Sequence, residues 1–238
     1  MIRGTASSFL LAMIQLPRLY CIADSAFFPS TSELLAFSKE LADGGCTLLQ
    51  YRNKSGNARV MLEQARELRR LFPTTQNQNP HFSQNRGEMG HPHLDISVQL
   101  IMNDRADLCL AADFDGVHVG QEDLSPEAVR KIIGPQRWLG VSTHNPEQLS
   151  EADLTSADYL AIGPVFATSS KARPDPVVGL EGVRRARALT RKPLVAIGGI
   201  TRANAASVIE TGADSVAVIS DLLREPRKSA EEFFRILR

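Results

Sequence analysis

The chain has 238 residues, in which 27 Lys and Arg balance 27 Asp and Glu, so the formal net charge at pH 7 is zero. Neither half carries a strong excess, because 10 basic and 8 acidic residues precede Val98, and 17 basic and 19 acidic residues lie from Val98 onward. We therefore expect no basic face for nucleic acid or for an anionic membrane. Hydrophobic residues at 43% indicate an ordinary globular chain.

The N-terminal segment is short and mixed in character. Its apolar run, Phe9 to Ile14, is far below the roughly 18 residues that a membrane span needs. Arg3 precedes this run as in a secretory leader, but Gln15 and Pro17 follow it without a small-residue cleavage site. We interpret residues 1–17 as an N-terminal extension.

The cysteines are odd in number and lack the spacing of metal ligands. Cys21, Cys46 and Cys109 all fall in apolar segments expected to form core elements. They are best interpreted as small buried side chains, which indicates a reducing compartment, the cytoplasm.

From Arg18 onward, short apolar segments rich in β-branched residues alternate with helical patterns. The expected strands cover residues 19–23, 47–51, 98–103, 116–119, 138–142, 159–162, 194–197 and 215–219. The expected helices cover residues 32–43, 58–72, 105–112, 125–133, 146–152, 180–190, 202–211 and 229–237. Strict alternation predicts a parallel sheet of the α/β class. Eight units in about 220 residues favour one (β/α)8 TIM barrel over residues 18–238, rather than an open sheet.

One segment, residues 73–97, has almost no hydrophobic period and is interpreted as a polar insertion. It joins a helix to the next strand, so we expect it at the rim opposite the active site. His81, His91 and His93 lie in it, but no Cys or carboxylate cluster accompanies them, which favours a solvated loop over a metal site.

Polar residues follow the second expected strand. Alternation places Gln50, Arg52 and Lys54 on the same side of the chain. Two cations and an amide at a barrel mouth suit a phosphate or diphosphate. The alternative is a strand end with two surface cations whose aliphatic stems cover apolar surface.

Carboxylates follow the third and fourth expected strands, at Asp104 and Asp123. Two carboxylates on adjacent strand ends repel each other unless a cation lies between them, and Mg2+ binds one or two carboxylates together with substrate phosphate oxygens. Both are therefore metal candidates. The alternative is that each one caps the helix that follows it.

Hydroxyl groups and histidines mark the next strand ends. Ser142 ends the fifth expected strand, and the loop after the sixth contains a hydroxyl-rich stretch that ends in a cation, Thr168 to Lys171. These groups suit an anion, although a flexible loop is the alternative. We interpret His144 as a hydrogen-bonding residue of the rim rather than a general acid or base, and His118 as a barrel-lining residue.

The strongest local signal follows the last two strands. Gly198 and Gly199 come directly after the seventh strand and before a helix, while Ile219 and Ser220 follow the eighth. In this barrel, the seventh and eighth loops with a helix N-terminus commonly form a phosphate site. A plain turn is the alternative, but the position favours phosphate.

Taken in order, these motifs resemble the thiamine-phosphate synthase (thiamine-phosphate pyrophosphorylase) family over nearly all of residues 18–237 except the insertion. The matching segments are Gln50 to Lys54, Asn103 to Arg105, Gly116 to Asp123, Gly140 to His144, Gly163 to Phe166 and Gly198 to Thr201. The resemblance implies a barrel enzyme that uses Mg2+. It implies that a hydroxymethylpyrimidine diphosphate and a thiazole phosphate are joined into thiamine phosphate and pyrophosphate.

The resemblance also implies roles for residues. The pyrimidine diphosphate would be held by Gln50, Tyr51, Arg52, Asn53, Lys54, Asn103, Ser142 and Lys171, of which Arg52, Lys54, Ser142 and Lys171 would be catalytic. Mg2+ would be held by Asp104 and Asp123. The thiazole phosphate would be held by Thr168, Ser169, Ser170, Gly198, Gly199, Ile219 and Ser220.

Two departures from the family pattern affect loops rather than the reaction. Asn53 stands where the family commonly has an acidic residue, and residues 167–172 lack the usual Pro-Thr-x-Thr-Lys-Lys sequence. Two rivals use the same barrel, a thiazole tautomerase and a non-catalytic sensor of thiamine intermediates. The presence of Asp123 and of a complete set of diphosphate ligands favours the synthase. Its partners would be two small phosphorylated substrates, with assembly into a homo-oligomer left open.

Overall fold

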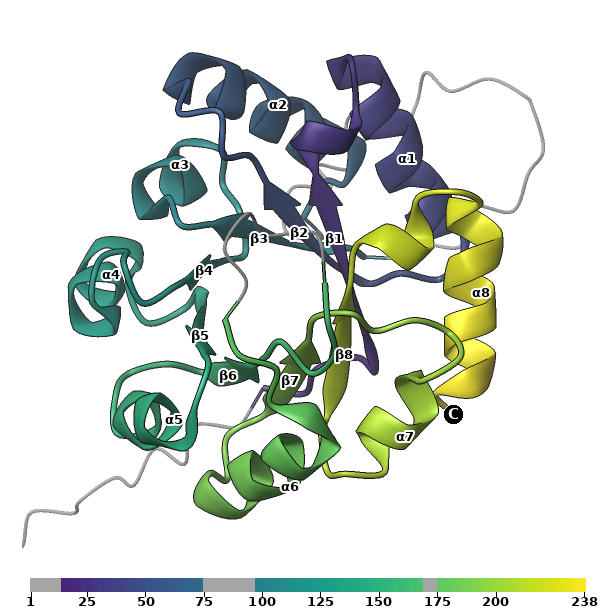
Figure 1. Cartoon of the computed structure of the whole chain (residues 1–238). Coiled ribbons are helices and arrows are strands. Elements are labelled where there is room, and N and C mark those ends of the chain that lie inside the picture. The colour runs from purple at the N-terminus through teal and green to yellow at the C-terminus, as the bar shows by residue number, and fades with distance from the viewer. Residues whose placement is uncertain (1–13, 75–96, 169–174) are drawn as a thin grey trace, which may run out of the picture.

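The structure, a computed structural model, describes residues 14–74, 97–168 and 175–238. Its strands form a closed parallel barrel in chain order, surrounded by helices (Figure 1). The strands are β1 (Leu19–Asp24), β2 (Leu48–Arg52), β3 (Gln99–Asn103), β4 (Gly116–Val119), β5 (Trp138–Thr143), β6 (Tyr159–Ile162), β7 (Leu194–Ile197) and β8 (Ser215–Val218). The predicted (β/α)8 barrel is confirmed.

The helices alternate with the strands around the outside of the barrel. They are α1 (Thr31–Asp43), α2 (Ala58–Leu71), α3 (Ala106–Ala111), α4 (Pro126–Ile133), α5 (Pro146–Asp153), α6 (Gly179–Leu189), α7 (Ala205–Ile209) and α8 (Pro226–Ile236). Two short 3-10 helices are η1 (Ser25–Phe27) and η4 (Ser220–Leu222). Side chains of Ser30, Asn57, Ser125 and Asn145 cap α1, α2, α4 and α5 by accepting a backbone N–H.

Two hydrophobic layers explain the composition of the strands. In β1, Leu19, Cys21 and Ala23 face the surrounding helices, whereas Tyr20 and Ile22 face the barrel interior. A strand that is buried on both faces has an almost continuous apolar sequence, as β1 does. The same alternation in the other strands directs one set of side chains along the barrel axis.

The amino-terminal end of the barrel is closed by apolar side chains. Ile14 and Leu16, from the expected N-terminal extension, pack with Trp138 against the interior cluster. The end of the extension therefore forms part of the barrel floor. The chain leaves α2 and returns to β3 at this same end, and residues 75–96, most of the predicted insertion, lie outside the described residues. His81, His91 and His93 lie outside the described residues.

The helix α7 is shorter than predicted, five residues rather than the ten of 202–211. The Thr201 N–H donates to the Asn204 side chain at 2.8 Å, and the Asn204 amide donates to the Gly199 carbonyl at 3.1 Å. Because these bonds hold residues 201–204 in a turn, the helix starts after Asn204 rather than directly after the glycines.

The three cysteines are free and buried. Among the described residues, no helix combines the length and the hydropathy needed to cross a bilayer.

Candidate active site

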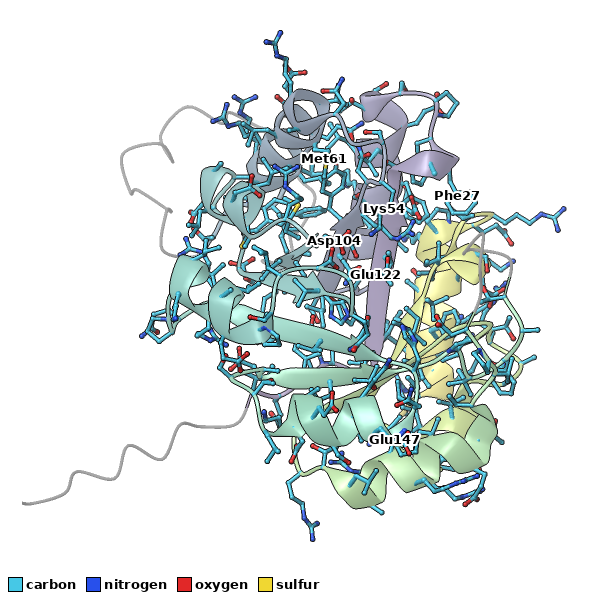
Figure 2. All side chains as sticks on the ribbon, turned by 60° about the vertical axis from the view of Figure 1, so that its left-hand side comes forward. Phe27, Lys54, Met61, Asp104, Glu122 and Glu147 are labelled. Atoms are coloured by element: carbon cyan, nitrogen blue, oxygen red, sulfur yellow. The ribbon has the colours of Figure 1, made fainter. Side chains whose placement is uncertain are left out.

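Polar side chains from adjacent strands converge at the carboxyl-terminal end of the barrel. The register pairs Asp24 with Arg52 and Asn103 with His118, so residues distant in sequence lie at the same height. Figure 2 shows Lys54 and Asp104 together at this mouth. The structure thus brings Lys54, Asp104 and Asp123 together from the ends of β2, β3 and β4.

An ion pair anchors the first cation. The guanidinium of Arg52 donates to Asp24, which is only 3% exposed, and the other Asp24 oxygen accepts the Ala26 N–H at 3.1 Å. Asp24 was not among the residues singled out from the sequence. It directly ends β1, so the rule of reading the residue at each strand end could have found it.

The two candidate metal ligands lie close to each other and to a cation. Lys54 forms an ion pair with Asp104. Burial raises the pKa of the Asp104 carboxyl above its ordinary value, Lys54 lowers it and the neighbouring Asp123 raises it. Such mutual influence of two carboxyl groups is what a shared cation would relieve.

The helix-capping alternative for these carboxylates is wrong. The N-cap of α3 is Arg105, which makes no side-chain cap bond, and the N-cap of α4 is Ser125. Asp123 instead accepts the Gly120 N–H at 2.7 Å within its own loop. Asp104 adopts a φ of 62°, uncommon for a residue with a side chain. Local strain of this kind is often found at functional sites.

A buried amide completes this group. Asn103, at the end of β3, is 8% exposed, and its Nδ2 has no hydrogen-bond partner among the described residues. A buried polar atom without a partner is costly unless a ligand satisfies it. The Asn103 amide is therefore a donor without a protein partner at this end of the barrel.

Tyr51 and Asn53 do not face the mouth. Both are buried on the outer side of β2. There the Tyr51 hydroxyl donates to Oε1 of Gln64 in α2 at 2.6 Å, and Nδ2 of Asn53 donates to the Tyr51 hydroxyl and to Gln64 Oε1, each at 3.0 Å. Because strand residues alternate between the two faces, these side chains cannot share the side of Gln50 and Arg52. We correct the initial assignment and leave both out of the diphosphate site.

A polar chain crosses the barrel interior beneath the mouth. It links Gln50, Tyr20, Tyr159, His118 and Ser142, with consecutive distances of 2.9, 2.9, 3.1 and 2.8 Å. Burial lowers the pKa of His118 to about 4, so its imidazole is neutral at pH 7. His118 lines the barrel as predicted. Tyr20 and Tyr159 were not singled out, because they lie within apolar strands rather than at their ends.

The glycines after β7 form a tight turn against the loop after β6. Gly198 and Gly199 have φ of 99° and 65°, in the left-handed region that favours glycine. A Cβ on Gly199 would lie 2.6 Å from the Ala167 carbonyl oxygen. The backbone N–H groups of Gly199 and Ser220 donate to no other group in the described part of the chain. They are thus available to an anion between the loops after β7 and β8.

The loop after β6 is described only at its two ends. Thr168 is half-buried, while Ser169, Ser170 and Lys171 lie outside the described residues. His144 holds the start of this loop, donating from Nδ1 to the Gly163 carbonyl at 2.7 Å. This agrees with the interpretation of His144 as a hydrogen-bonding residue of the rim.

Comparison with known proteins identifies the family. A profile described as "Thiamine monophosphate synthase" matches residues 93–222. A thiamine-phosphate synthase of Koribacter versatilis is 56% identical over 227 residues, covering 94% of this chain and 97% of its own. This chain belongs to the thiamine monophosphate synthase family. A relative from Chloroflexus aurantiacus, also a thiamine-phosphate synthase, is 40% identical and covers 85% of this chain and 83% of its own.

A solved structure of the family agrees with the sequence matches. The thiamine phosphate pyrophosphorylase of Pyrococcus furiosus superimposes with a TM-score of 0.73 at 33% identity, covering 92% of this chain and 95% of its own. The thiamine monophosphate synthase family places this chain among the transferases, in thiamine biosynthesis. The predicted family and enzyme class are confirmed.

Proposed function

We propose that this enzyme joins a hydroxymethylpyrimidine diphosphate to a thiazole phosphate, giving thiamine phosphate and pyrophosphate with the help of Mg2+. The observation that carries the proposal is the pair of adjacent carboxylates, Asp104 and Asp123, beside Lys54. The same barrel mouth carries Arg52 and the unpartnered buried amide of Asn103. This combination suits a metal-bound diphosphate better than a single phosphate.

The donor set fits Mg2+. Among the described residues, no cluster of three or more His, Cys, Asp or Glu side chains could form an all-protein metal cage. Mg2+ is typically held by one or two carboxylates with the remaining positions filled by water and substrate phosphate oxygens. Asp104 and Asp123 supply two carboxylates, and the diphosphate would supply the rest.

The protein groups act mainly by positioning and by electrostatics. When bound, Mg2+ supplies positive charge that stabilises the departing pyrophosphate. Arg52 and Lys54 bind oxygens of the same diphosphate. The ion pairs of Arg52 with Asp24 and of Lys54 with Asp104 hold both cations near the mouth before the substrate binds. Asn103 and Ser142 donate hydrogen bonds to the diphosphate, and Lys171 is proposed to add a further charge.

The bond changes need no protein nucleophile. The bond between the pyrimidine methylene carbon and the diphosphate oxygen breaks, and its electron pair leaves with pyrophosphate. The electron-rich pyrimidine supports positive charge at that carbon, and the lone pair of the thiazole nitrogen forms the new bond. Holding the two substrates in contact supplies much of the rate enhancement.

The thiazole phosphate is proposed to lie at the other side of the mouth. The N–H groups of Gly199 and Ser220 would donate to its oxygens, with Gly198 and Ile219 shaping the two turns. Because α7 starts only at Ala205, the turn rather than the helix dipole provides most of the attraction. Thr168, Ser169 and Ser170 are proposed to cover this phosphate.

Three free, buried cysteines suit a reducing compartment, and we propose the cytoplasm as the site of action.

The decisive experiment mixes the purified protein with both substrates and Mg2+ and follows thiamine phosphate and pyrophosphate. We expect both products, and none when Mg2+ is removed by a chelator. Tautomerisation of the thiazole phosphate without coupling would instead identify the tautomerase. Binding of either substrate without any turnover would identify the sensor.

A matched glycine pair tests the phosphate turn. Gly199 and Gly179 both have φ of 65°, but a Cβ on Gly179 meets nothing within 4 Å. Alanine imposes similar backbone strain at both positions, so only Gly199→Ala adds a clash with the loop after β6. We expect Gly199→Ala to weaken thiazole phosphate binding by about tenfold or more, as the loss of a charge-assisted hydrogen bond would, and Gly179→Ala to leave binding near wild type. Calorimetric titration measures both, and equal losses would contradict the assignment.

A further inference from the structure

The polar chain beneath the mouth is the feature of this barrel that the proposed reaction leaves unexplained. Its residues come from β1, β2, β4, β5 and β6, and its tyrosine hydroxyls and imidazole are buried. Each consecutive pair lies within hydrogen-bond distance, in the order Gln50, Tyr20, Tyr159, His118, Ser142. A continuous chain of this kind has a direction, because each hydroxyl carries one proton.

The first link sets that direction. The Gln50 amide nitrogen can only donate, so the Tyr20 oxygen accepts from it. The Tyr20 proton then has one acceptor among the described residues, the Tyr159 oxygen at 2.9 Å. A buried hydroxyl proton without an acceptor would be costly, so Tyr20 donates to Tyr159.

The histidine passes the direction of these hydrogen bonds on to Ser142. The Tyr159 oxygen already accepts from Tyr20, so its own proton goes to Nδ1 of His118, at 3.1 Å. His118 must then carry its single proton on Nε2, which donates to the Ser142 oxygen at 2.8 Å. The Ser142 proton is the end of the chain and has no acceptor within it.

Close packing around His118 fixes the positions of its hydrogen-bonding partners. A Cβ on Gly140, the residue of β5 beside His118, would come within 2.1 Å of Tyr159 Cζ and 2.4 Å of His118 Nδ1. Only glycine leaves room for this contact. The Tyr20 and Tyr159 rings also meet edge to face, with centroids 6.1 Å apart.

We propose that Gln50 is a positioning residue that holds His118 in its Nε2–H tautomer. It acts through the hydroxyl groups of Tyr20 and Tyr159. The Ser142 hydroxyl, which accepts from His118, is then free to donate its own proton to an anion in the mouth. This rests on the proposed function only in naming that anion as the diphosphate. A hydroxyl committed as a donor suits an anion, because a phosphate oxygen is an acceptor only. In the reverse direction, the Ser142 hydroxyl would donate its hydrogen bond to His118 and could not donate to the anion.

The test reads the His118 tautomer directly, independently of activity. In protein labelled with nitrogen-15 at histidine, an unprotonated ring nitrogen resonates far downfield of a protonated one, and His118→Asn assigns the signals by their loss. In the wild type we expect Nδ1 unprotonated and Nε2 protonated. In Gln50→Glu, the carboxylate can only accept, so we expect the whole chain to reverse and the proton to move to Nδ1. In Tyr20→Phe, which breaks the chain, we expect both tautomers.

Matched controls separate this inference from the reaction. Tyr51→Phe removes a buried hydroxyl on the opposite face of β2. That hydroxyl donates to Gln64, which is not part of the hydrogen-bonded series, so the His118 tautomer should stay unchanged. An Nδ1–H tautomer or a doubly protonated ring in the wild type would overturn the proposal. So would an unchanged tautomer in both folded Gln50→Glu and Tyr20→Phe. If the wild type were inactive but showed the expected tautomers, the proposed reaction would be wrong, while the proposed direction of the hydrogen bonds would stand.

Discussion

Replacing Asp104 or Asp123 by asparagine is expected to lower Mg2+-supported turnover by about 100-fold or more, because losing even a partner of a metal ligand costs about 10–100-fold. Asparagine preserves the shape of the side chain but removes the negative charge that attracts the cation. Burial and the neighbouring carboxylate raise the pKa of Asp104, so its charge is costly in the free site. The Asp104→Asn variant should therefore remain as stable as the wild type or become more stable. Steady-state turnover against Mg2+ concentration and thermal unfolding measure the two effects.

The matched control is Asp107→Asn. Asp107 lies three residues after Asp104 but is exposed and paired with Arg105. Removing its charge should change turnover by less than about twofold, since exposed ion pairs contribute little. If Asp104→Asn and Asp123→Asn both kept near wild-type turnover and Mg2+ dependence, the metal assignment would be wrong.

Replacing Arg52 by alanine is expected to affect both catalysis and stability. Turnover should fall by about 100-fold or more, because a group that stabilises the leaving diphosphate is lost. Asp24, which is 3% exposed, would lose its cationic partner. Breaking a buried pair costs about 3–5 kcal/mol, and since the Arg52 side chain is 23% exposed we expect about 2–3 kcal/mol. Denaturant unfolding and steady-state kinetics measure the two losses.

The double variant Asp24→Asn/Arg52→Ala distinguishes these effects. Neutralising Asp24 removes the uncompensated buried charge, so most of the lost stability should return while activity stays low. Lys39→Ala, which breaks the exposed pair with Asp43, provides the surface reference and should cost less than about 1 kcal/mol. An Arg52→Ala protein as stable as Lys39→Ala would show that the Asp24 pair contributes little.

The strand ends show which site residues the sequence could predict. Arg52 and Asp104 were found because each directly follows a predicted strand, and the barrel brings such positions to one rim, whereas Asn103, the last residue of its strand, came from the family resemblance. Asp24 obeys the same rule, because it directly follows the first predicted strand, residues 19–23. Tyr51 and Asn53 were included because they lie within a motif, although alternation already placed them on the opposite face.

The sequence by itself determined the alternation of strands and helices, the number of units, the family and the rim that carries the chemistry, because hydrophobic period and the order of motifs are properties of neighbouring residues. Only the tertiary structure decided that Asp104 and Asp123 do not cap helices, that Arg52 pairs with Asp24, and that Tyr20 meets Tyr159 across 139 positions of chain. Those contacts depend on closure of the barrel and on the register of its strands. Both result from packing the whole interior at once, which no single segment encodes.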